Sequence, residues 1–181
     1  MRSAELDLLF IPGLNGSGPD HWQTRWRSRL PTAKLVEQAD WDRPDLEGWV
    51  GAVVAASRRA ERPIVFIAHS LGVTTLAHAA ALLPPGLAKG AFLVAPPGDE
   101  ALRAVGAGAF APTPTERLPF PSLLIASRND PYGVHELAEA KAAQWGSRLV
   151  TAGDAGHINA DSGHGPWPEG LMQFAGFIKS L

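Results

Sequence analysis

Ser70 stands between an apolar run and a stretch rich in helix-forming residues, within the segment Ala68-His69-Ser70-Leu71-Gly72. A strand that turns abruptly into a helix at such a position strains the backbone of the serine and exposes its hydroxyl as a nucleophile. The tight turn requires small residues two before and two after the serine, which Ala68 and Gly72 provide. The alternative is a serine that only caps a helix N-terminus. The segment alone leaves both interpretations open.

A serine hydroxyl is a weak nucleophile unless a base accepts its proton and a third group orients that base. Asp130 follows the apolar run Ser122–Ala126, and His157 follows the run Arg148–Thr151, in the order Ser, Asp, His. That order is typical of the strand–turn–helix nucleophile. Because parallel strands present their carboxyl ends at one edge of the sheet, we expect the three side chains to meet there. The sequence therefore predicts a Ser70–His157–Asp130 triad for acyl transfer.

A glycine-rich segment, Pro12-Gly13-Leu14-Asn15-Gly16, follows the first apolar run. Glycine lets the backbone approach a substrate closely. We expect the backbone N–H groups of Leu14 and of Leu71, directly after Ser70, to stabilise an oxyanion. A phosphate cradle is the weaker alternative, because neither a following Lys-Ser or Lys-Thr pair nor the G-x-G-x-x-G spacing is present. The tentative substrate-binding residues are Asn15, His69 and Trp167.

The other histidines are expected to serve packing or the surface, and His164 is the main rival to His157 because its loop is equally rich in glycine. A metal site is a further alternative for this loop. Its ligands would be Asp154, His157, Asp161 and His164. Because they are spread through a loop and not presented by one helical face, we predict neither a metal nor any other cofactor.

Short apolar runs alternate with helix-like stretches along the chain. The expected strands are Leu6–Ile11, Lys34–Val36, Pro63–Ala68, Ala91–Ala95, Ser122–Ala126 and Arg148–Thr151. Runs that are apolar without alternation are typical of parallel strands buried on both faces. The expected helices are Asp20–Leu30, Asp45–Arg59, Leu71–Leu83, Val134–Trp145 and Pro168–Leu181. The pattern predicts one α/β domain over residues 1–181, with a largely parallel six-stranded sheet and helices on both faces.

The segment Pro96–Pro121 interrupts this alternation and is rich in proline and glycine. We expect a short helix near Glu100–Val105 and otherwise a path over the surface. Such a segment is either a lid or a simple connection. Phe110 and Leu118 are candidates for the wall of an acyl pocket. No large cap domain is expected.

Composition excludes several classes of function. Sixteen Lys and Arg against eighteen Asp and Glu give a net charge of −2, which argues against nucleic acid or an anionic membrane as a partner. The absence of cysteine excludes disulfides, a thiol nucleophile and iron–sulfur clusters. The N-terminus carries acids where a signal peptide carries basic residues, and no apolar run reaches the roughly 18 residues of a membrane span. We expect a cytoplasmic protein whose oligomeric state the sequence does not indicate.

The sequence resembles the small serine hydrolases of the α/β-hydrolase superfamily typified by retinoblastoma-binding protein 9 and the YdeN-like proteins. The matching segments are Pro12–Gly16 with His21-Trp22, Ala68–Gly72, Ser127–Tyr132, and Gly156–Gly163 leading into Trp167–Gly170. The resemblance implies an α/β hydrolase with a compact core and a triad at Ser70, Asp130 and His157. It leaves the substrate open.

We therefore expect a carboxylesterase-like serine hydrolase that cleaves an ester or thioester of a small acyl substrate through an acyl-enzyme. One alternative is a catalytically weak interaction module on the same fold, since fold does not dictate function. Another is a peptidase or amidase with the same triad. A serine at position 70 argues against haloalkane or epoxide chemistry, which would use an aspartate there.

Overall fold

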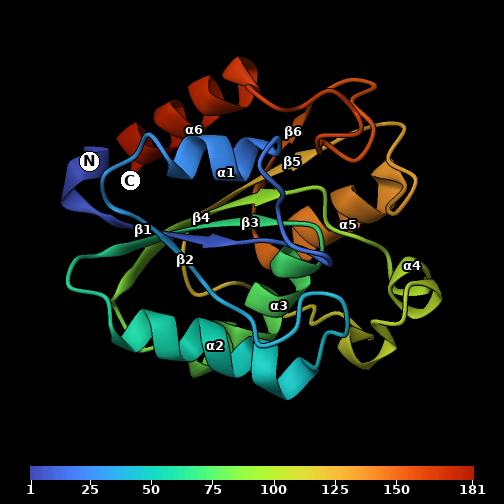
Figure 1. Ribbon diagram of the computed structural model, residues 1–181, viewed down its shortest axis with the longest axis horizontal. Helices are drawn as coiled ribbons and strands as arrows, with labels where there is room; N and C mark the ends of the chain where they lie inside the picture. Colours follow the sequence, from blue (N-terminus) through green and yellow to red (C-terminus); the bar gives the residue numbers. More distant parts are fainter.

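The computed structural model describes residues 1–181 and contains a single six-stranded sheet (Figure 1). The strands are β1 (Asp7–Ile11), β2 (Ala33–Leu35), β3 (Ile64–His69), β4 (Ala88–Val94), β5 (Ser122–Ala126) and β6 (Arg148–Thr151). Their order is β2-β1-β3-β4-β5-β6, and every neighbouring pair is parallel. This confirms the predicted sheet, and all of its strands are parallel.

Helices cover both faces of the sheet, as predicted (Figure 1). They are α1 (Trp22–Arg27), α2 (Leu46–Arg58), α3 (Leu71–Ala79), α4 (Asp99–Ala104), α5 (His135–Trp145) and α6 (Pro168–Ser180). Short 3-10 helices lie at Ser3–Glu5, Ala80–Leu82 and Gly108–Phe110. The helices α2, α3 and α5 share one apolar cluster with the sheet, and α1 and α6 share the other. None of the helices combines the length and the apolar character needed to cross a membrane.

The strands are apolar without alternation because each contributes side chains to both clusters. In β3, Ile64, Phe66 and Ala68 belong to the cluster under α2 and α3, whereas Val65 and Ile67 belong to the cluster under α1 and α6. All five of these side chains are fully buried. Successive residues of a strand point to opposite faces, so a strand covered on both sides needs apolar residues throughout.

Some helices and strands begin or end at residues other than the predicted ones. The helix α1 begins later than expected because the ring Nδ1 of His21 caps it by accepting the N–H of Gln23. The helix α3 ends at Ala79 and continues only as a 3-10 turn before Pro84. The strand β4 begins three residues earlier than predicted, at Ala88, because its first residues, Ala88-Lys89-Gly90, form no continuous apolar run.

One buried carboxylate ties the start of β1 to its neighbours. Asp7 is fully buried, and its oxygens lie 2.9 Å from Lys34 Nζ and 3.2 Å from an Arg62 guanidinium nitrogen. The backbone N–H of Glu61 also donates to it, at 2.8 Å. Burial by itself raises the pKa of Asp7, but the Lys34 hydrogen bond and the backbone donors outweigh it, so the pKa is lowered. The ionised carboxylate thereby joins β1, β2 and the turn before β3.

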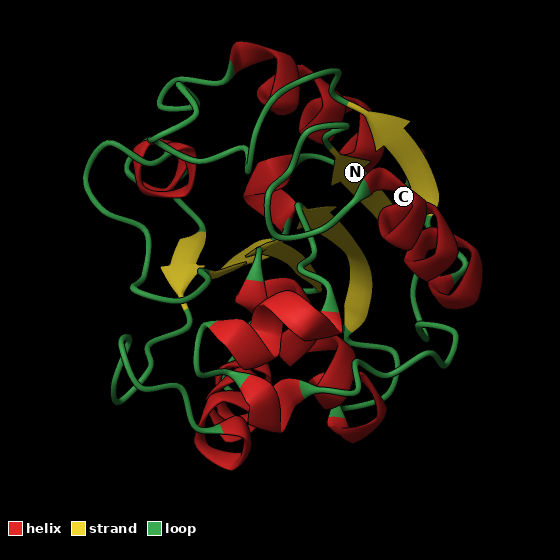
Figure 2. Ribbon diagram, turned by 90° about the vertical axis from the view of Figure 1, so that its right-hand side faces the viewer, coloured by secondary structure: helices red, strands yellow, loops and turns green.

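The segment between β4 and β5 packs against the molecule over much of its length. It contains α4 and the 3-10 helix Gly108–Phe110, and Phe110 is buried against Trp49, Leu71 and Leu102. Leu118 belongs to the main core cluster. Figure 2 views the molecule from the carboxyl ends of the strands, where this segment and the other long loops gather in front of the sheet.

Candidate active site

Ser70 occupies a strained turn between β3 and α3. Its backbone angles are φ 54° and ψ −125°, in a region that residues with a side chain rarely adopt. The turn is so tight that a Cβ on Gly72 would overlap the backbone carbonyl of Ile11. The side chain of Ser70 makes no capping hydrogen bond to α3. The N-cap interpretation is therefore wrong, and the strained turn that exposes a serine hydroxyl is present.

The Ser70 hydroxyl lies at one end of a continuous hydrogen-bond chain. Ser70 Oγ is 2.8 Å from His157 Nε2, and His157 Nδ1 is 2.9 Å from each carboxylate oxygen of Asp130. Because a carboxylate accepts, Nδ1 carries the proton of the neutral imidazole and Nε2 is free to accept the serine proton. The side chains of His157 and Asp130 are only 9% and 2% exposed, so water competes little for these bonds.

Two polar residues on the loop after β5 hold the loop that carries His157. Asn129 Oδ1 accepts the N–H of Gly156 at 2.7 Å, and Ser127 Oγ accepts the N–H of Ala155 at 2.9 Å. The hydroxyl of Ser127 also donates to Asn129 Oδ1 at 2.8 Å. Both residues lie in the matching segment Ser127–Tyr132, but the sequence predicted no role for them. Their position directly after a buried strand and before Asp130 is the signal that points to them.

Two backbone N–H groups beside Ser70 are free to donate. Gly13 packs so closely against the turn that a Cβ there would lie 2.8 Å from the Cβ of Ser70, which brings the N–H of the next residue, Leu14, to this region. The N–H of Leu14 makes no hydrogen bond within the protein. Leu71 is the first residue of α3, where an N–H has no intrahelical acceptor. The N–H of Asn15, by contrast, donates to the carbonyl of Trp41 at 2.8 Å.

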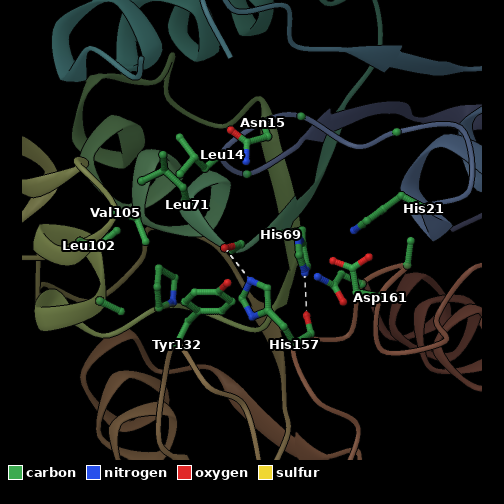
Figure 3. A pocket seen from close by; sticks show the side chains of 18 residues that line it. Leu14, Asn15, His21, His69, Leu71, Leu102, Val105, Tyr132, His157 and Asp161 are labelled. Atoms are coloured by element: carbon green, nitrogen blue, oxygen red, sulfur yellow. Dashed lines mark hydrogen bonds between the residues drawn. The ribbon is translucent and has the colours of Figure 1, made fainter. Parts of the chain in front are cut away.

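A cavity of about 300 Å³ opens in front of Ser70 (Figure 3). Two of the three tentative substrate-binding residues, Asn15 and His69, line it. Trp167 does not line it, contrary to expectation. Its indole is 5% exposed and packs between Trp22 and Trp26, with ring centroids 5.0 and 5.6 Å away. Burial of a large aromatic surface in the core explains this placement.

The Pro96–Pro121 segment contributes to the cavity, but through residues other than those expected. Phe110 and Leu118 are absent from the cavity wall, because both are buried in apolar clusters. The wall is formed by Pro97, by two residues of α4 and by the residue that directly follows this helix. Those α4-region residues are Ala101, Leu102 and Val105.

Two further histidines, His21 and His69, line the cavity beside His157. His69 Nε2 donates to the backbone carbonyl of His157 at 2.9 Å, and the rings of His21 and His69 meet edge to face with centroids 4.8 Å apart. Burial, followed by the charge of His157, lowers the pKa of His21 to about 4. The same causes hold the pKa of His69 well below its usual value. Both rings are therefore neutral at pH 7.

The remaining alternatives for the His157 loop do not match the geometry. His164 bonds Ser162 through Nδ1 at 3.1 Å and lies against Trp167, so the base beside Ser70 is His157. No group of three or more histidine, aspartate or glutamate side chains is arranged to hold a metal ion. The four loop residues considered as ligands therefore do not converge on one point.

The lowered pKa of His21 makes stability depend on pH. Between about 6.5 and 4 the unfolded chain binds a proton at His21 that the folded chain does not, so the free energy of unfolding falls as the pH is lowered through this range. The shift corresponds to a loss on the order of 3 kcal/mol. His21→Asn keeps a side-chain oxygen that can cap α1 and removes the titration. Urea unfolding at pH 4.5 and 7 should show a smaller acid loss in the variant than in the wild type. Equal losses in both proteins would contradict the assignment.

Comparisons with known proteins show the family and the fold of the chain. Residues 8–176 match the family described as Serine hydrolase. A YdeN-like hydrolase from Pectobacterium atrosepticum is 35% identical, with a TM-score of 0.86 over 97% of this chain and 91% of that chain. The ydeN gene product of B. subtilis is 18% identical, with a TM-score of 0.79 over 97% and 99%.

More distant structures share the fold alone. Est1E from Butyrivibrio proteoclasticus, in a structure with ferulic acid bound, is 15% identical with a TM-score of 0.63, over 94% of this chain and 89% of that chain. A search of curated proteins finds no match to this sequence. The family match covers nearly the whole chain and includes the residues around Ser70, Asp130 and His157. The chain therefore belongs to the serine hydrolase family, within the α/β-hydrolase fold.

Proposed function

We propose that the protein is a serine esterase that cleaves carboxylic esters of small acyl substrates through an acyl-enzyme intermediate. The observation that carries this proposal is the hydrogen-bond chain from Asp130 through His157 to Ser70, with the accepting nitrogen of the imidazole turned toward the serine hydroxyl. A buried base oriented by a carboxylate is what a serine needs to act as a nucleophile.

In the proposed mechanism, Ser70 Oγ attacks the ester carbonyl carbon while His157 Nε2 accepts the hydroxyl proton. The carbonyl oxygen becomes an oxyanion and accepts hydrogen bonds from the N–H groups of Leu14 and Leu71. The carbon–oxygen bond to the alcohol then breaks, and His157 Nε2 delivers its proton to the departing alkoxide. A water molecule, deprotonated by His157, attacks the acyl-enzyme, and the carboxylic acid leaves as Ser70 regains its proton. Asp130 stabilises the transient imidazolium throughout.

An ester is favoured over an amide because its carbonyl is less stabilised by resonance and because an alkoxide leaves more readily than an amide nitrogen that has not been protonated. The cavity of about 300 Å³ lies at the lower end of the range for ligand pockets, which supports a small substrate. The esterase domain of a Rhodothermus marinus protein, which has the same fold, supports the reaction class by analogy of fold.

Labelling with a fluorophosphonate probe tests the proposal. Wild-type protein should gain the mass of one phosphonyl group, and peptide mapping should place that group on Ser70. The labelled protein should also lose its activity toward p-nitrophenyl butyrate. A well-folded wild type that takes no label and hydrolyses no ester would contradict the proposal and favour the interaction-module alternative.

A further inference from the structure

The cavity around Ser70 has two chemically different walls. In Figure 3, Leu102 and Val105 lie on one side of His157, and His21, His69 and Asp161 lie on the other. The first group comes from the α4 region, and the second from β3 and from loops that precede α1 and follow His157. A substrate whose two halves both lie within the cavity would place one half against each wall.

The apolar wall is held rigidly. Leu71 and Leu102 are 2% and 1% exposed and belong to a cluster with Trp49 and Phe110 behind them. Val105 lies further out and is 39% exposed at the rim of the cavity. The wall is formed by Leu14, Leu71, Ala101, Leu102 and Val105. These five side chains carry no hydrogen-bonding group, so they can desolvate a hydrocarbon chain at no cost in polar contacts. Tyr132 lies between them and His157 and adds a phenol ring with one hydroxyl (Figure 3).

The polar wall offers both a donor and acceptors. His21 Nδ1 accepts the N–H of Gln23, so the proton of this neutral ring is on Nε2, which has no protein partner. His69 donates through Nε2, which leaves Nδ1 as an acceptor. Asp161 is an exposed carboxylate that forms no ion pair. Among the residues that line the cavity there is no lysine or arginine. The wall is formed by His21, His69, Asn159 and Asp161.

We propose that the acyl group of the substrate lies along the apolar wall and the alcohol along the polar wall, so that the preferred substrates are esters of short apolar acids with a small alcohol that carries a hydroxyl or ammonium group. This inference rests on the proposed esterase function. It makes Asp161 and Val105 specificity-determining residues for the two halves of the substrate.

The position of His157 decides which half faces which wall. The departing alkoxide must receive a proton from His157 Nε2 and therefore leaves on the side of the imidazole. The polar wall is continuous with that side, because His69 bonds the carbonyl of His157 and Asp161 follows on the same loop. The apolar wall instead includes Leu14 and Leu71, whose backbone N–H groups are the proposed oxyanion donors that hold the carbonyl of the acyl group.

The charge of the polar wall limits the alcohols that it accepts. Asp161 is its only charged group at pH 7, because burial keeps His21 and His69 neutral. The carboxylate of Asp161 attracts a cationic alcohol and repels an anionic one. Both effects are moderate because Asp161 is exposed to solvent. Thioesters of phosphorylated carriers, whose leaving group is anionic, are disfavoured for the same reason.

The test compares butyrate esters of three alcohols in a pH-indicator assay: choline, its neutral isostere 3,3-dimethylbutanol, and the anionic 3-hydroxypropionate. For the wild type, kcat/KM should fall in that order. Asp161→Asn should lower the choline-to-dimethylbutanol ratio about 2- to 5-fold, as expected for one partly solvated charge. Asp154→Asn, an exposed acid on the same loop outside the cavity, is the matched control and should leave the ratio unchanged.

The acyl half is tested with acetate, butyrate and hexanoate esters of 3,3-dimethylbutanol. Val105→Ser should lower the hexanoate-to-acetate ratio about threefold, through loss of apolar contact. Leu82→Ser, at an exposed leucine outside the cavity, serves as its control.

Unchanged ratios in Asp161→Asn and Val105→Ser would overturn the inference while leaving an active esterase, and so would a preference for the anionic ester. The inference would also be overturned if Asp161→Asn changed the preference for the acyl group and Val105→Ser changed the preference for the alcohol. A wild type that hydrolyses none of the esters would instead refute the esterase function itself.

Discussion

Replacing Ser70 with alanine is expected to lower kcat/KM for ester hydrolysis by about 10⁴-fold or more, because no acyl-enzyme can form. The residual rate over the uncatalysed reaction would come from the free N–H groups beside position 70 and from substrate binding. The fold should survive, since Ser70 Oγ bonds only His157 and a Cβ is already accommodated at this strained backbone position. Initial rates on p-nitrophenyl butyrate and a thermal unfolding curve measure both quantities.

Ser28→Ala is the control for this substitution. Ser28 is an exposed serine at the end of α1, and its hydroxyl bonds only the carbonyl of Arg25. The control variant should retain wild-type kcat/KM and full fluorophosphonate labelling. Activity of a purified Ser70→Ala protein within tenfold of the wild type would remove Ser70 from the mechanism.

Replacing Asp130 with asparagine is expected to lower kcat by about 10³- to 10⁴-fold with a much smaller change in KM. An amide N–H next to His157 Nδ1 favours the tautomer that carries its proton on Nε2, and that nitrogen then no longer accepts the proton of Ser70. Asparagine keeps an oxygen that can accept the N–H of Tyr132, as Asp130 Oδ1 does at 2.9 Å. The turn after β5 is therefore preserved, and the loss should fall on the chemical step.

The kinetic constants of Asp130→Asn decide between a role in catalysis and a role in the turn alone. If Asp130 served only the turn after β5, at Asn129-Asp130-Pro131, the variant would show reduced thermal stability with kcat near that of the wild type. Asp154→Asn again provides the control, because Asp154 is an exposed acid on the neighbouring loop, loosely paired with Arg128 at 3.9 Å. It should match the wild type in kcat and KM.

The sheet could be predicted from the sequence with small differences at the strand ends, and so could the edge of the sheet at which Ser70, Asp130 and His157 lie. β5 and β6 have the predicted limits, Ser122–Ala126 and Arg148–Thr151. A strand buried on both faces needs an unbroken apolar run, and such a run is visible without knowing any contact. Ser70, Asp130 and His157 come together because each directly follows a strand of one parallel sheet, so chain order is enough to place all three at the same edge.

The surroundings of Ser70, Asp130 and His157 could not be predicted from the sequence, because they depend on packing between distant segments. Trp167 lies in the aromatic core and not in the cavity, because the direction of its side chain depends on packing against α1. His21 and His69 acquire lowered pKa values only through burial beside His157. The two walls of the cavity combine residues from distant segments, such as Leu14 with Leu102 and His21 with Asp161. Local sequence patterns encode which residues form an element, whereas side-chain neighbours across a cavity depend on how those elements pack in three dimensions.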